Sequence, residues 1–187
     1  MNHADFRSAR ERDDLEVQQV TAGWLEAFEA ALASQNADRV AGLFVEAGNW
    51  RDVLAFTWHL TPRVGAKAIA QALVARQGAV QAHGFEINPE RTPPRRAKRL
   101  GQACIEALYR FETAVGRGEG LLRLVPADAG GAAGHKAWVF STSLEELKGF
   151  EDKVGDRRPT GAAFSRNFGG DNWEDARRKA QDYADRD

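Results

Sequence analysis

The sequence holds a single cysteine, Cys104, among its 187 residues. An internal disulfide is therefore excluded, and a reducing compartment is expected. Because Cys104 falls in an apolar stretch, we interpret it as a buried thiol rather than as a nucleophile. Lysine and arginine number 26 and aspartate and glutamate 27, a net charge of −1. No overall field would attract nucleic acid or an anionic membrane, and neither is expected as a partner.

Long apolar segments are also lacking. No run approaches the length of a membrane span, and the charged N-terminal residues contain no apolar core of a signal peptide. We therefore expect a cytoplasmic location. The four histidines are not at metal-ligand spacing, so no zinc or iron site is predicted. A composition of 43% hydrophobic and 28% charged residues is typical of a globular domain large enough to bury its own core.

The first half of the chain favours helices. After a charged segment over 1–14, expected to be flexible, apolar residues recur at three- and four-residue steps over 15–34. A second, shorter helix is predicted over 38–44 and a third over 66–76. Two short strands, over 50–56 and 57–64, are predicted between them.

The second half favours strands separated by glycine-rich turns, predicted over 83–91, 103–115, 120–125 and 136–147. The glycines from 116 to 120 are interpreted as a hairpin turn. The strand over 136–147 is apolar on both faces, so the sheet needs cover on both sides, from its own helices or from a second copy of the chain.

This order of helices followed by antiparallel strands predicts the α+β class. From Gly155 the composition changes to turn-forming and charged residues, with a helix predicted to start near Asn172. We therefore divide the chain into a main domain over 15–150 and an extended arm with a linker-like helix over 151–187.

The segment from Leu43 to Asp52, Leu-Phe-Val-Glu-Ala-Gly-Asn-Trp-Arg-Asp, resembles a segment of ketosteroid isomerase-like and polyketide-cyclase-like proteins. These belong to the nuclear-transport-factor-2-like superfamily. The resemblance implies a cone-shaped, strongly curved, mostly antiparallel sheet packed against three helices from the N-terminal half. It also implies a largely apolar pocket and a homodimer formed through the sheet face.

Several dispersed stretches are also similar to the N-terminal region of predicted flavin-containing monooxygenases. They are 50–58, 89–95, 111–118, 144–149 and 168–173. The resemblance implies a flavoprotein monooxygenase domain as partner. No Gly-x-Gly-x-x-Gly follows a strand in this sequence, so no cofactor is expected in this chain. FAD and NADPH would belong to a separate catalytic domain.

Asp52 matches the general base of ketosteroid isomerases, a carboxylate that moves a proton beside a carbonyl group. His59 is close enough in sequence to act with it as an acid or base. Phe28 lies where the family has its oxyanion tyrosine, so that donor does not carry over. An ion pair of Asp52 with Arg51 or Arg110 is the structural alternative.

A set of aromatic residues, with one arginine, is predicted to line the pocket and contact an apolar ligand. Its members are Trp24, Phe28, Trp50, Trp58, Tyr109, Arg110 and Trp138. Ordinary core packing is the alternative for the aromatic members. The densest basic run is Arg91, Arg95, Arg96, Lys98 and Arg99. It is interpreted as a charged strand edge, or as a contact for the catalytic domain or a cofactor phosphate.

Three functional hypotheses follow. The first is an accessory or apolar-ligand-binding domain of a flavin-dependent monooxygenase, without flavin chemistry of its own. The second is an independent isomerase, lyase or hydrolase that uses Asp52 as general base. The third is a structural dimerisation module, which a pocket filled by protein side chains would favour.

Overall fold

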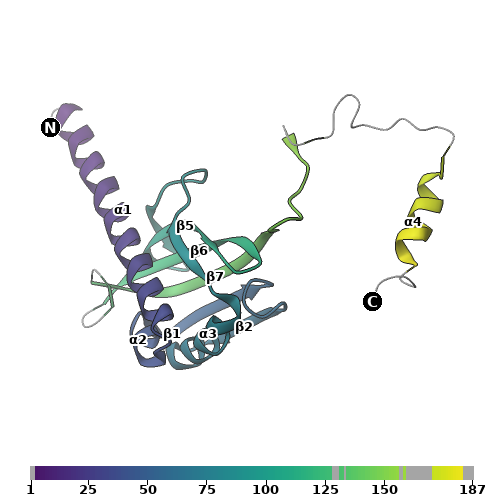
Figure 1. Ribbon diagram of the computed structural model, residues 1–187. Coiled ribbons are helices and arrows are strands. Elements are labelled where there is room, and N and C mark those ends of the chain that lie inside the picture. The colour runs from purple at the N-terminus through teal and green to yellow at the C-terminus, as the bar shows by residue number, and fades with distance from the viewer. Residues whose placement is uncertain (1–2, 128–130, 133, 156–157, 159–169, 183–187) are drawn as a thin grey trace. The chain divides into compact units, whose positions relative to one another are not determined.

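The computed structural model describes residues 3–127, 131–132, 134–155, 158 and 170–182 (Figure 1). The chain divides into two compact units, Met1–Glu151 and Asp152–Asp187. Each unit is described by itself below.

Three helices of the described residues belong to the first unit, as the sequence predicted. Helix α1 (His3–Ala33) begins twelve residues before the predicted start; Asp13 on its extra turns and Glu16 pair with Arg96 at 2.6 and 3.1 Å. Helix α2 (Ala37–Gly42) is capped by Asn36, whose side chain accepts a hydrogen bond from the Arg39 amide at 3.0 Å. Helix α3 (Ala66–Val80) extends one turn beyond its predicted end. No helix in the described ranges is long and apolar enough to cross a membrane.

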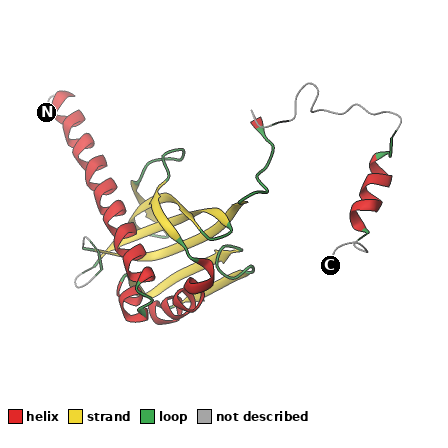
Figure 2. Cartoon of the chain, viewed as in Figure 1, coloured by secondary structure: helices red, strands yellow, loops and turns green. Residues whose placement is uncertain are grey.

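Seven strands of the described chain form one curved sheet in the order β2-β1-β7-β6-β5-β3, and β4 pairs beside β3 on the same edge of β5 (Figure 2). β1 and β7 run parallel, and the other neighbours are antiparallel. The strands are β1 (Phe44–Val53), β2 (Leu60–Val64), β3 (His83–Ile87), β4 (Arg95–Arg99), β5 (Gln102–Glu112), β6 (Gly116–Pro126) and β7 (His135–Leu147). The predicted α+β class with a curved, mostly antiparallel sheet and three helices is thereby confirmed.

Two strands, β6 and β1, begin earlier than predicted, because glycines near their starts were interpreted as turn residues. The predicted turn over 116–120 is wrong, because these residues form the start of β6. At Gly118 an added Cβ would collide with the ring of Phe111, and at Gly120 with the ring of Tyr109. The glycines therefore let two large rings lie across β6. Similarly, β1 begins at Phe44 and runs through Gly48, where its pairing with β7 changes register.

Alternation along the strands gives the sheet two different faces. We call the face that carries Trp50, Ile105, Tyr109, Leu122 and Phe140 the helix face, because these residues form one buried cluster with helices α1 and α3. The residues between them in sequence lie on the opposite face, which we call the open face. It carries Glu106, Leu108, Leu121, Arg123 and Val139.

Aromatic rings fill the space between the helix face and the helices. Trp24 stacks on Phe28 at a centroid distance of 5.2 Å, and Tyr109 stacks on Phe140 at 5.3 Å. Phe28 and Phe140 join the two stacks at 4.8 Å. All four side chains are fully buried. Cys104 is buried as predicted, and burial raises the pKa of its thiol.

The second unit contains helix α4 (Trp173–Gln181). Asn172 caps it by accepting hydrogen bonds from the amides of Glu174 and Asp175, both at 2.9 Å. The predicted helix start near Asn172 is therefore correct. The turn residues predicted over 159–169 lie outside the described residues.

Candidate functional site

Asp52 lies on the helix face of β1, and its carboxylate is fully buried. Four donors surround it. The amides of Phe56 and Thr57 donate at 3.0 and 2.7 Å, and the hydroxyls of Thr57 and Thr142 donate at 2.7 Å each. A carboxylate offers about four lone-pair positions, so these donors occupy its accepting capacity. No lone pair is left to take a proton from a substrate.

The Asp52 carboxylate shapes the loop over 54–59, which the sequence had divided between two strands. Leu54 and Trp58 adopt φ values of 66° and 56°, in the left-handed region that a bulky residue seldom enters. Trp58 directly follows Thr57, which binds Asp52, and the Leu54 amide donates to the His59 carbonyl across the loop at 3.3 Å. The carboxylate therefore holds an uncommon loop conformation, a structural role.

The other residues of the predicted catalytic arrangement do not assemble around Asp52. His59 is exposed, and its backbone amide lies 3.3 Å from the Thr57 hydroxyl. Among the described residues Asp52 does not form the alternative ion pair, because amides and hydroxyls bind it and Arg110 pairs with Glu86 at 2.6 Å. Arg51 follows Trp50 on β1 and points to the open face.

The predicted aromatic pocket is divided among three environments. Trp24, Phe28 and Tyr109 belong to the filled core, where burial and the Asp52 carboxylate raise the pKa of Tyr109 well above its ordinary value. Trp50 is also buried and donates through its indole to Thr142 at 3.0 Å. Trp58 is exposed on the loop over 54–59, and Trp138 is half-buried on β7. Core packing, the alternative interpretation, describes the first four.

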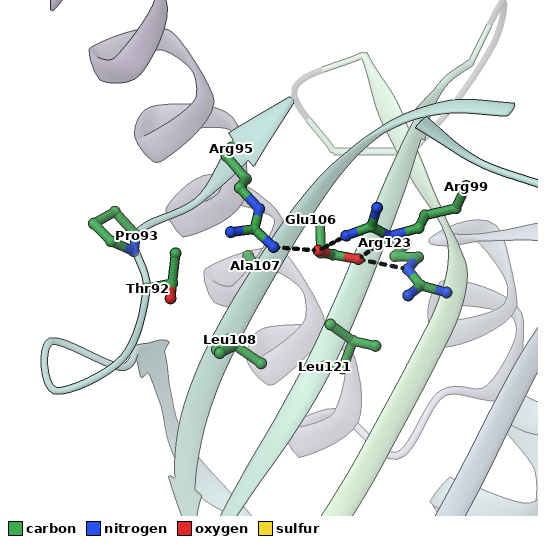
Figure 3. Close-up of a pocket in the computed structure, with 9 residues that line it drawn as sticks. All are labelled: Thr92, Pro93, Arg95, Arg99, Glu106, Ala107, Leu108, Leu121 and Arg123. Carbon is green, nitrogen blue, oxygen red and sulfur yellow. Dashed lines mark hydrogen bonds and ion pairs between the residues drawn. The ribbon is translucent and has the colours of Figure 1, made fainter. Parts of the chain in front are cut away.

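A different cluster of charges lies on the open face, where β4, β5 and β6 are neighbours (Figure 3). Glu106 is 9% exposed and binds three arginines: Arg95 at 3.0 Å, Arg99 at 2.6 Å and Arg123 at 3.0 Å. These hydrogen bonds, that of Arg99 above all, lower the pKa of Glu106 from 4.5 to about 2. The carboxylate therefore stays ionised under ordinary conditions.

These four charged side chains line a hollow of about 330 Å³, which we call the arginine hollow. Pro93, Leu108 and Leu121 supply apolar surface beside them, as Figure 3 shows. Three positive charges face one negative charge, which leaves an excess of two positive charges. The arrangement can therefore attract an anion, and the apolar surface can hold a hydrocarbon portion beside it.

The guanidinium groups retain donors for such a ligand. Among the described residues, Arg95 and Arg123 each bind Glu106 through one nitrogen, Nη2 and Nε respectively. The other two nitrogens of each guanidinium have no protein partner there. Glu106 fixes one edge of each group, so little side-chain freedom remains to be lost when an anion binds.

Sequence reasoning identified the basic run but not its carboxylate partner. The prediction of a charged strand is confirmed for Arg95, Arg96, Lys98 and Arg99, which lie on β4 beside β5, whereas Arg91 lies outside the strand and pairs with Glu119 at 2.9 Å. A signal for Glu106 existed: a two-residue turn at Leu100 and Gly101, both with positive φ, places Arg95 opposite Glu106. Arg123 comes from a strand later in the chain, so its approach depends on the pairing of β5 with β6.

The described ranges contain no candidate metal site, because no three histidine, cysteine, aspartate or glutamate side chains lie close enough together to hold an ion.

Comparison with known proteins concerns the fold. No protein-family model and no curated protein matches the chain. Among solved structures, it is similar to an NTF2-like protein with a cystatin-like fold from Novosphingobium aromaticivorans, at 16% identity and a TM-score of 0.49, over 77% of this chain and 91% of that one. A protein with a cystatin-like fold from Caulobacter vibrioides has 13% identity and a TM-score of 0.48, over 70% and 90%. One from Nostoc punctiforme has 9% identity and a TM-score of 0.45, over 72% and 90%.

Proposed function

We propose that this chain is a ligand-binding module that holds a small organic anion in the arginine hollow. One observation carries the proposal: three arginines converge on one buried glutamate and leave two positive charges in excess beside apolar surface. The proposal moves the ligand from the interior to the open face, since aromatic rings fill the interior.

An accessory role beside a flavin-dependent monooxygenase remains part of the proposal, supported by the sequence resemblance alone. In that role the chain would bind or deliver an acidic compound, and the flavin chemistry would take place in another domain. The alternative, an enzyme that uses Asp52 as its base, has less support because four protein donors occupy that carboxylate.

Titration calorimetry at low ionic strength tests the anion site, with octanoate as the probe and octanol as its uncharged counterpart. We expect octanoate to bind and octanol to bind at least about tenfold more weakly, because the charged hydrogen bonds are lost. Arg123→Gln should weaken octanoate binding by a similar factor, while Arg123→Lys keeps the charge and should recover part of it.

Arg110→Gln is the matched control. Arg110 also lies on the open face, but it pairs with Glu86 outside the hollow. Its removal should change octanoate affinity less than about twofold. Equal binding of octanoate and octanol, or equal losses in the Arg110 and Arg123 variants, would overturn the proposal.

A homodimer through the open face remains the second candidate, because Leu108, Leu121 and Val139 are only half-buried there. Sedimentation velocity with and without octanoate distinguishes a ligand site on this face from a dimer interface. A ligand site that stays open predicts no change in mass upon binding. A dimer that covers the hollow predicts dissociation when octanoate binds.

A further inference from the structure

A second hollow lies beside the arginine hollow on the open face. It has a volume of about 390 Å³ and is formed by strands β1, β2, β6 and β7. Leu121 lines both hollows. Val139 and Val64 supply apolar surface in the second one, and Arg51 supplies its positive charge. We call it the distal hollow.

The arginine of the distal hollow lacks an acidic partner, because Arg51 pairs with no carboxylate of the described residues. Its neighbour on β2, Arg63, pairs in register with Trp50 and therefore belongs to the helix face. Uncompensated guanidinium groups beside apolar surface are suited to bind a carboxylate or phosphate.

Strand register places the two hollows side by side. Glu106 pairs with Arg123, Arg123 with Val139, and Val139 with Asn49, in one row across β5, β6, β7 and β1. In the next row Leu108 pairs with Leu121, whose amide donates to the Ser141 hydroxyl at 3.0 Å. Ser141 pairs with Arg51. Two strand spacings, about 10 Å, therefore separate the strand of Arg123 from the strand of Arg51.

Apolar side chains occupy the middle of this surface. Leu121 on β6 and Val139 on β7 lie between the arginines of the two hollows and are half-buried. From the arginine hollow to the distal hollow, the surface is therefore positive, then apolar, then positive again. A ligand complementary to it has an acidic group at each end and a hydrocarbon middle.

We propose that the two hollows form one elongated site for a linear dianion, such as a dicarboxylate with an apolar chain. This inference rests on the proposed anion site and adds a second anchoring point to it. Arg51 would bind the second acidic group, while Leu121 and Val139 would contact the chain between the two ends.

Calorimetry with suberate and octanoate tests the inference, because the two probes have the same number of carbons and differ in one terminal carboxylate. We expect suberate to bind about tenfold more tightly than octanoate at low ionic strength. Arg51→Gln should abolish this advantage and leave octanoate affinity within about twofold of the wild-type value. Arg123→Gln should weaken both probes.

The outcomes separate this inference from the anion site itself. If octanoate binds in an Arg123-dependent way but suberate binds no more tightly, the elongated site is overturned and the single anion site remains. The same holds if Arg51→Gln leaves the suberate advantage intact. If neither probe binds, both proposals fail. Arg110→Gln again serves as the control and should leave the ratio of the two affinities unchanged.

Discussion

Two buried carboxylates lie on opposite faces of the same sheet, and they are stabilised by different chemistry. Asp52, on the helix face, accepts hydrogen bonds from amides and hydroxyls, all of them uncharged. Glu106, on the open face, is bound by three guanidinium groups. Asp52 is fully enclosed, whereas the arginines around Glu106 keep between 24% and 53% of their side-chain surface exposed.

The contrast shows how burial of an ionised group relates to function. The donors around Asp52 bind Asp52 and other protein groups: the Thr142 hydroxyl also accepts from the Trp50 indole, and the Thr57 hydroxyl also bonds the Thr61 hydroxyl. This network is closed within the protein and fixes a loop. The arginines around Glu106 bring more charge and more donors than one carboxylate can use, so the network remains open to a second anion. An excess of donors, rather than burial alone, therefore marks the candidate site.

The largest expected effect is that of Asp52→Asn. An amide offers one acceptor oxygen to four donors and turns its own N–H groups toward two of them. We expect the free energy of unfolding to fall by about 3 kcal/mol at pH 7, measured by urea denaturation. The loop over 54–59 should also lose protection of the Phe56 and Thr57 amides from hydrogen exchange.

Asp38→Asn is the control for that experiment, because Asp38 is exposed on α2 and its replacement should cost less than about 1 kcal/mol. A fully stable Asp52→Asn protein with unchanged amide exchange would contradict the structural role of this carboxylate. It would also return Asp52 to consideration as a general base.

An intermediate effect is expected for Gly120→Ala, which tests the packing of the helix face. The added Cβ would meet the Tyr109 ring and the Ser141 carbonyl oxygen. Tyr109 is fixed by stacking on Phe140 and by a hydrogen bond to Ser141 O at 2.7 Å, so neither obstacle can move freely. We expect a loss of about 2–3 kcal/mol in the free energy of unfolding.

Gly78→Ala is the matched control with the opposite sign. Gly78 lies inside α3 with nothing within 4 Å of the added carbon, so the change should stabilise the protein by up to about 1 kcal/mol. If Gly120→Ala were equally harmless, the rings on the helix face would be loosely packed. A ligand in the interior, as the sequence first suggested, would then become possible again.

The fold was predictable from the sequence to the extent that side-chain periodicity records it. Alternation in β5 separated Tyr109 and Phe111 from Glu106 and Arg110 correctly, and the helices appeared where apolar residues repeat. Glycine was the source of the errors in strand boundaries. It was interpreted as a turn at Gly118 and Gly120, whereas the structure uses its small size beneath two rings.

The candidate site was predictable only in part, for a physical reason. A local pairing such as Arg95 with Glu106 follows from one short turn, whereas Arg123 and Arg51 come together on the open face through pairings between distant strands. Asp52 attracted attention because of the family resemblance. Its four donors include Thr142, which is ninety residues away in sequence. No local sequence pattern predicts this contact.

The smallest of the stability effects is expected for Glu106→Gln, and it tests the open face. The folded-state pKa of Glu106 is lowered from 4.5 to about 2, so the ionised form stabilises the fold above pH 4.5. This contribution is lost progressively as the pH falls from about 4.5 toward 2. Because the arginines are partly exposed and screened by water, we expect about 2 kcal/mol rather than the larger value that the full shift implies.

Wild-type protein should therefore exceed Glu106→Gln in stability by about that amount at pH 7, and the difference should shrink in urea titrations repeated between pH 5 and pH 3. Glu86→Gln, which removes an exposed glutamate paired with one arginine, should cost less than about 1 kcal/mol. A pH-independent difference would mean that Glu106 does not organise the arginines electrostatically. The open face would then be an ordinary charged surface, and the contrast between the two carboxylates would lose its functional meaning.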